Sequence, residues 1–123
     1  GVTGKMYFYY NYCWIKKISG GFIQPDFRVV DAVWFHILES CEYKHYNKGK
    51  GVICVKRRRG GFSWKQSSDS LHGSLFKPGT EIGMTANGEE DAKLLFDKVH
   101  SIYERLPVFL LSPLWRGILK YCS

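Results

Sequence analysis

The sequence predicts an α/β fold: a small, mostly parallel sheet with flanking helices, preceded by an aromatic strand or hairpin and a helix. From Val52 onward, segments of strand and helix character alternate with short links, which is the order of parallel strands joined by crossover helices. A chain of 123 residues is long enough for one modest core and too short for two. Its composition, 45% hydrophobic and 24% charged, is that of a globular domain. We therefore expect a single domain over residues 1–123.

The N-terminal region, residues 1–50, is expected to form an aromatic strand and a helix. The segment Met6–Ile15 (MYFYYNYCWI) is rich in strand formers, and a turn at Ser19–Gly21 returns it as a hairpin through Phe22–Gln24. A helix follows, because six apolar residues recur at helical spacing. These residues are Val30, Val33, Trp34, Ile37, Leu38 and Cys41. We expect Asp26 or Asp31 to cap the start of this helix.

The C-terminal region, residues 51–123, is expected to contain two strand–helix units. Val52–Val55 is a short β-branched run, and Ser63–Phe76 has the length and one-sided apolar pattern of a helix. Thr80–Thr85 is the expected second strand. The clearest helical periodicity covers Ala92–Leu106, and the acidic residues just before it suit the positive end of a helix dipole.

The net charge of +7 is concentrated in one stretch of the chain. Between Lys44 and Lys65 there are eight of the eighteen basic residues and no Asp or Glu, whereas the remainder has ten basic and eleven acidic residues. This distribution predicts a local anion-binding site rather than a generally basic surface.

Other features exclude several classes of protein. No apolar run approaches the ~18–20 residues of a membrane span, and the chain does not open with a signal peptide. The four cysteines form no CxxC pair, and the four histidines are scattered, so no zinc site is expected. We expect reduced thiols and a cytosolic, non-secreted protein without a membrane partner.

The chemistry is expected in the basic, glycine-containing segment between Val52–Val55 and the next helix. In phosphate-binding loops a buried strand turns through glycines, backbone N–H groups and the helix start face the phosphates, and a hydroxyl opening the helix ligates Mg²⁺. Here Gly60 and Gly61 supply the glycines and Ser63 the hydroxyl, but Phe62 stands where lysine normally precedes the hydroxyl. The cations lie upstream, beginning at Lys56.

This segment, KRRRGGFSW, resembles the deviant Walker A loop of the large terminase subunits that package the DNA of tailed phages. The family's loop reads Lys-x-x-Arg-x-Gly-(Tyr/Phe)-Ser, and its places are taken by Lys56, Arg59, Gly61, Phe62 and Ser63. The flanking sequences are also similar, so that the resemblance covers most of residues 6–110. It implies the truncated N-terminal part of a P-loop NTPase-like ATPase domain, with residues 51–123 as its P-loop βαβα region.

The resemblance also implies a function and a set of site residues. It implies ATP and Mg²⁺ as cofactors, with ATP hydrolysis coupled to translocation of double-stranded viral DNA in the host cytoplasm. The portal protein, the small terminase subunit and further copies of the chain are the implied partners. The nucleotide-binding residues are expected to be Lys56, Arg59, Gly60, Gly61, Phe62 and Ser63, with Ser63 ligating Mg²⁺. Contacts with DNA or phosphate are expected from Arg57, Arg58 and Lys65.

One part of the ATPase is missing from the sequence, so no catalytic residue is assigned. A terminase needs an apolar strand ending in Asp-Glu to hold Mg²⁺ and activate water. The nearest match, Leu94–Asp97, lies inside a helical pattern. We therefore expect weak nucleotide binding and negligible turnover from this chain.

Other interpretations remain open. The chain is alternatively a non-catalytic nucleic-acid-binding module that uses the basic loop, or a structural remnant without a ligand. Ser63 and Gln66 fit a helix capping box, which needs no ligand. The aromatic cluster at Tyr7–Trp14 either stacks on bases or is buried against the following helix.

Overall fold

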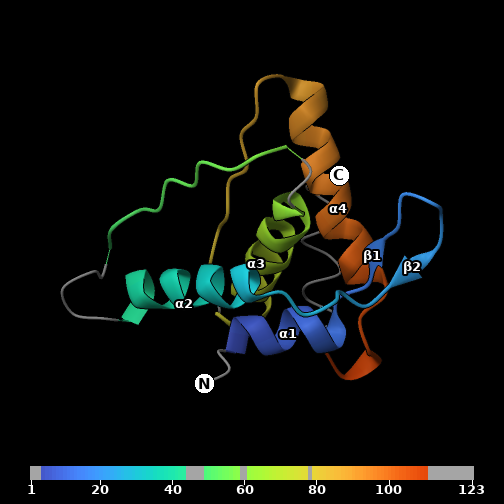
Figure 1. The fold of residues 1–123 in the computed structure, drawn as a ribbon, viewed down its shortest axis with the longest axis horizontal. Helices are drawn as coiled ribbons and strands as arrows, with labels where there is room; N and C mark the ends of the chain where they lie inside the picture. Colours follow the sequence, from blue (N-terminus) through green and yellow to red (C-terminus); the bar gives the residue numbers. More distant parts are fainter. Residues whose placement is uncertain (1–3, 44–48, 59–60, 78, 111–123) are drawn as a thin grey trace.

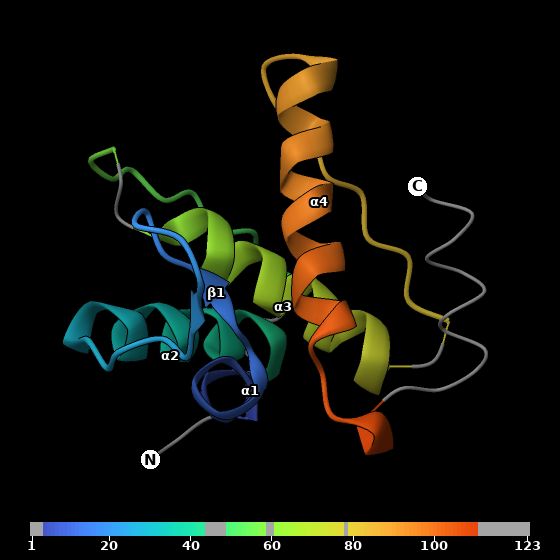
Figure 2. The same cartoon turned by 90° about the vertical axis from the view of Figure 1, so that its right-hand side faces the viewer.

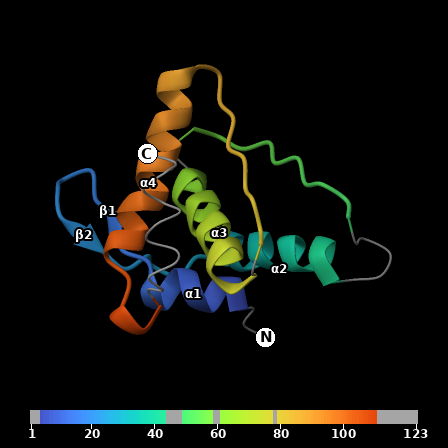
Figure 3. The same cartoon turned by 180° about the vertical axis from the view of Figure 1, so that it is seen from behind.

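The computed structural model describes residues 4–43, 49–58, 61–77 and 79–110, and over these ranges the protein is mainly helical (Figure 1). In chain order the elements are α1 (Gly4–Tyr12), β1 (Ile15–Lys16), β2 (Phe22–Ile23), α2 (Val29–Tyr43), α3 (Phe62–Phe76), α4 (Glu89–Glu104) and the single 3₁₀ turn η1 (Val108–Leu110). Helix α3 is central: α4 packs against one side of it and α1 against another, and α1 also contacts α2 (Figures 1 and 3).

The expected α/β fold with a mostly parallel sheet is wrong. In the part of the chain that the structure describes, the sheet consists of β1 and β2 alone, which pair antiparallel with Ile15 opposite Ile23. The segments Val52–Val55 and Thr80–Thr85 lie outside any strand. Val52 is half-buried against the core, but Ile53 is 95% exposed and Val55 is 96% exposed, and among the described residues this β-branched run has no partner strand. Strand propensity alone does not make a strand when pairing and burial are missing.

The first expected strand, Met6–Ile15, is also wrong over most of its length, because Gly4–Tyr12 forms helix α1. Met6, Tyr9 and Cys13 are buried, and their spacing of three and four residues is helical. Phe8 is buried as well, with its ring edge-on to that of His72 at 5.4 Å between centroids. Tertiary packing of these large side chains therefore overrides the strand preference of the aromatic residues.

The remaining expected elements are confirmed. The three helices α2, α3 and α4 form where periodicity placed them, and the hairpin turns at Ser19–Gly21, where Gly20 and Gly21 both adopt positive φ. Asn11 on α1 accepts a hydrogen bond at its carbonyl from Gln24 Nε2 (2.9 Å), just beyond β2. The Arg105 guanidinium lies 3.4 Å from the centroid of the Phe22 ring, which fixes the hairpin against the end of α4.

Helix α2 buries only part of the expected face, because Trp34 and Leu38 pack in the core as expected but the other buried residues differ. Trp34 and Phe35 are buried with Asp31, whereas Val30, Val33 and Ile37 are 44–52% exposed. Neither Asp26 nor Asp31 has a described capping hydrogen bond, and Asp31 lies inside the protein. The buried carboxylate of Asp31 is the centre of the candidate site.

Small residues let α3 occupy the centre of the fold. Ser67, Ser68 and Ser70 are buried, and the hydroxyl of Ser68 lies 3.3 Å from the Cys13 sulfur. A Cβ at Gly73 would lie 3.2 Å from Ile82 Cδ1, so this glycine permits a close approach of the chain that follows α3. The apolar core is formed by Leu71 of this helix and by side chains from other parts of the chain. The core side chains include Met6, Phe8, Tyr9, Phe35, Leu71, Val99, Ile102 and Leu106.

Candidate functional site

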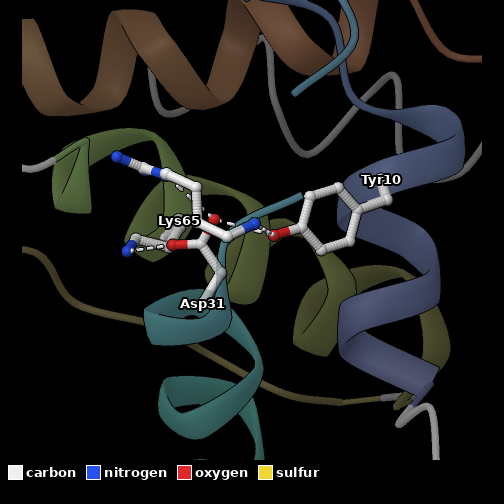
Figure 4. Close-up of polar contacts among 4 residues, drawn as sticks. Tyr10, Asp31 and Lys65 are labelled. Carbon is white, nitrogen blue, oxygen red and sulfur yellow. Dashed lines mark hydrogen bonds and ion pairs between the residues drawn. The ribbon is translucent and has the colours of Figure 1, made fainter. Parts of the chain in front are cut away.

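A buried ion pair joins α2 to the start of α3. The Lys65 ammonium lies 2.5 Å from Asp31 Oδ1, and both side chains are 0% exposed. Tyr10 of α1 donates a hydrogen bond to Asp31 Oδ2 at 2.7 Å, and Arg28 Nε lies 3.3 Å from the same oxygen. Figure 4 shows Tyr10, Asp31 and Lys65 converging from three helices. The carboxylate is therefore surrounded by donors, which is the condition for keeping a charge inside a protein.

The aromatic side chains beside this cluster enclose the Lys65 ammonium. Its Nζ lies 3.7 Å from the centroid of the Phe62 ring, which packs edge-on against Trp34 at 5.3 Å. Lys65 was expected to contact DNA or phosphate, but full burial separates it from any such ligand. Its role is structural, because it neutralises Asp31 and ties two helices together.

The phenol of Tyr10 is held in its protonated form. Burial, followed by the hydrogen bond to Asp31, raises the pKa of Tyr10 to about 12. Its hydroxyl also accepts a hydrogen bond from the backbone N–H of Arg28 at 3.3 Å. Tyr10 therefore bridges the buried carboxylate and the residue that precedes α2.

Three of the predicted site residues, Lys56, Arg57 and Arg58, are exposed in the extended segment that leads to α3. No acidic residue occurs between Lys44 and Lys65 to neutralise them locally. Two other predicted residues, Arg59 and Gly60, lie outside the described residues. The structure thus places three cations together on the surface, within a few residues of the helix start.

The start of α3 combines a left-handed glycine with the Arg28 side chain. Gly61 is the N-cap residue with φ of 73° and no side-chain capping hydrogen bond, so the capping box of Ser63 and Gln66 is wrong. A Cβ at Gly61 would lie 2.8 Å from Arg28 Nη2. The guanidinium therefore lies against the backbone at the positive end of the helix dipole. Arg58 is three residues from Gly61, so their Cα atoms are within about 11 Å.

The charged groups at the start of α3 are mostly positive. Within the cluster of Tyr10, Arg28, Asp31 and Lys65, two cations face one carboxylate. The exposed side chains of Lys56, Arg57 and Arg58 add positive charge nearby, as does the helix dipole. Positive charge therefore accumulates at this end of α3.

The other elements of the predicted nucleotide site are only partly present. Phe62 and Ser63 open α3 as half-buried residues, and the Ser63 carbonyl accepts a hydrogen bond from Ser67 Oγ at 2.7 Å. The strand that should deliver Lys56 to a phosphate loop does not form. Among the described residues there is no group of three or more His, Cys, Asp or Glu side chains able to hold a metal ion. Magnesium ligation by Ser63 stays a prediction.

Sequence reasoning missed the residues that organise the site, namely Tyr10, Arg28 and Asp31. One signal was available: Asp31, Trp34 and Phe35 share the helical spacing of a buried face, and an acid in such a position requires an internal cation. The identity of that cation was hidden, because Lys65 is 34 residues further along the chain.

Comparisons with known proteins add no assignment. No protein-family model, curated protein or solved structure matches the chain. The resemblance to terminase ATPases therefore stays a prediction. Over the described ranges, no helix has both the length and the apolar character needed to cross a membrane.

Proposed function

We propose that the chain is a non-catalytic nucleic-acid-binding module that holds the phosphate backbone with the cations before α3. The observation that carries this proposal is the exposure of Lys56, Arg57 and Arg58 in a segment without acidic residues. Lysine and arginine bind nucleic-acid phosphates by releasing condensed counterions, which supplies most of the affinity of sequence-independent binding.

The shape of the segment favours a polymeric ligand over a single nucleotide. The backbone of residues 51–58 has no helix or strand, and its three basic residues, Lys56, Arg57 and Arg58, follow one another along an exposed chain. Such an arrangement spreads the charges along the surface, so they suit successive phosphates of a strand. A triphosphate needs donors that converge, as a tight loop after a buried strand provides.

The predicted ATP-binding role in a phage packaging terminase is a separate hypothesis, as is the location in the host cytoplasm. Its remaining support is the pair Gly61 and Ser63 at the start of a long helix. It makes a distinct prediction: Mg·ATP should raise the melting temperature of the protein, and Ser63→Ala should abolish that rise.

Binding of fluorescein-labelled DNA, measured by fluorescence anisotropy at low salt, tests the proposed function. The triple variant Lys56→Ala/Arg57→Ala/Arg58→Ala should bind at least about tenfold more weakly than the wild type, since three phosphate contacts are lost. The matched control removes three exposed lysines from the hairpin and α4. It is Lys16→Ala/Lys17→Ala/Lys93→Ala.

The control separates a local site from the effect of net charge, because both variants lose three positive charges. The proposal expects the control to bind within about threefold of the wild type. Equal losses in both variants, or no binding of DNA by the wild type, would contradict it. A melting temperature that responds to Mg·ATP and not to DNA would support the ATP-binding hypothesis instead.

A further inference from the structure

An exposed aromatic ring belongs to Phe27, the residue before Arg28, whose guanidinium lies at the start of α3. Phe27 is 65% exposed, although it is a large apolar side chain, and it immediately precedes Arg28. Its ring contacts Tyr10 in a tilted arrangement, with 5.8 Å between centroids and 42° between planes. Phe27 is thus supported by one aromatic neighbour while much of its surface faces solvent.

The hydrogen bonds around Tyr10 fix where this ring is held. The Tyr10 hydroxyl binds both Asp31 Oδ2 and the backbone N–H of Arg28, so the chain at residues 27–28 is tied to the buried ion pair. The Arg28 guanidinium in turn lies against Gly61, as its 2.8 Å approach to a Cβ at that position shows. These contacts hold Phe27 next in sequence to Arg28. The Arg28 guanidinium lies against Gly61, three residues after Arg58.

We propose that Phe27 is a stacking platform for an unpaired base, and that the ligand of the basic segment is single-stranded nucleic acid. This inference rests on the proposed function and narrows its ligand. In a duplex the faces of the bases are covered by their neighbours, whereas a single strand offers each base face to an aromatic side chain. Adjacent cations bind the phosphates that connect the stacked bases.

The chemical requirements of single-strand binding are met by adjacent groups. Arg28 is 46% exposed at its side chain and lies against Gly61, and Lys56, Arg57 and Arg58 are exposed in the segment that precedes α3. Stacking depends on the π-face, which all bases share, so little sequence preference is expected.

The test compares variants of Phe27 on two labelled ligands, an oligothymidylate and a mixed-sequence duplex of the same length. Phe27→Ala and Phe27→Leu should each weaken binding of the single strand about tenfold, since both remove the ring, and Phe27→Tyr should bind like the wild type. Duplex affinity should change less than about twofold, because it depends on the phosphate contacts.

Phe109→Ala is the control for removing an exposed phenylalanine. Phe109 is 74% exposed and contacts Tyr12. It belongs to η1, on the opposite side of α1 from the chain that leads into α2 (Figure 2). This variant should bind both ligands like the wild type. Phe27→Leu also protects the test against misfolding, because leucine retains an apolar contact with Tyr10.

The results distinguish this inference from the proposed function. If Phe27→Ala and Phe27→Leu bind the single strand as tightly as the wild type while the triple basic variant does not, the stacking platform is wrong and the phosphate-binding role stands. If the wild type prefers the duplex, the assignment of a single-stranded ligand is wrong. If the wild type binds neither ligand, both proposals fail.

Discussion

Lys56 and Lys65 belong to the same basic stretch of sequence but lie in opposite environments. Lys56 is exposed on an extended segment, whereas Lys65, one turn into α3, is 0% exposed and pairs with Asp31. The difference arises because α3 directs the side chain of Lys65 toward the core, whereas residues 56–58, which precede α3, remain on the surface. A run of like charges therefore does not define one surface: part of it stabilises the fold, and the rest is available to a ligand.

The largest expected effect is on the structural side of this comparison. Lys65→Met should lower the free energy of unfolding by about 3–5 kcal/mol, because it leaves the Asp31 carboxylate buried without its closest cation. Chemical denaturation measures the loss. Lys56→Met is the matched control and should change the free energy of unfolding by less than about 0.5 kcal/mol.

A double variant sharpens the same test. Asp31→Asn/Lys65→Met should be less destabilised than the two single changes added together, because the unpaired buried charge is absent. If Lys65→Met and Lys56→Met have the same free energy of unfolding, the two lysines contribute equally to stability. The assignment of Lys65 to the core and Lys56 to the surface is then wrong.

The next largest effect on stability is expected at Gly61, which lies between the exposed cations and the buried Lys65. Gly61→Ala should destabilise the protein by about 1–2 kcal/mol from the left-handed backbone alone, and it also displaces the Arg28 guanidinium. Gly79→Ala is the control, since Gly79 has φ of 74° but no atom within 4 Å of its Cβ position. Thermal unfolding should show a larger loss for Gly61→Ala, and equal losses would exclude crowding by Arg28.

A smaller effect is expected at His72, which belongs to α3 like Lys65. Burial, and then the charge of Lys5, lowers the pKa of His72, while Asp69 acts in the opposite direction. The folded protein therefore disfavours the protonated ring. Stability is fully present above the unfolded pKa of about 6.5 and is lost as the pH falls through the folded pKa.

Denaturation measured between about pH 5 and about pH 8 tests this prediction. The slope from one residue cannot exceed about 1.4 kcal/mol per pH unit. In His72→Gln, the part of the slope that comes from protonation of this ring should disappear. An unchanged slope in His72→Gln would show that this ring does not sense the pH.

The helices that the sequence predicts correctly are those with their own periodic pattern. Residues 92–106 carry an apolar stripe, the acidic residues Glu89, Glu90 and Asp91 come just before it, and α4 forms over Glu89–Glu104. The hairpin follows from a local turn at Gly20 and Gly21. These features require only neighbouring residues, which a sequence displays directly.

The errors occur where distant residues decide the structure. Val52–Val55 has the composition of a strand but no partner, and Met6–Ile15 becomes mainly helical because its aromatic side chains pack on α2 and α3. Within the site, Lys56, Arg57 and Arg58 are exposed, whereas the strand predicted to precede them does not form, and their binding roles stay predictions. The burial of Lys65 depends on Asp31, and the placement of Arg28 depends on Tyr10 and Gly61, so neither was visible in local sequence.

The salt dependence of single-strand binding tests the central claim most directly, namely that the segment before α3 contacts a phosphate backbone. A plot of the logarithm of the association constant against that of the salt concentration should be linear. Its slope should be shallower by about 2 in Lys56→Ala/Arg57→Ala/Arg58→Ala than in the wild type. Each lost phosphate contact reduces the slope by about 0.7, and three contacts are removed. Parallel lines for the two proteins would contradict the claim, since the three cations would then release no counterions.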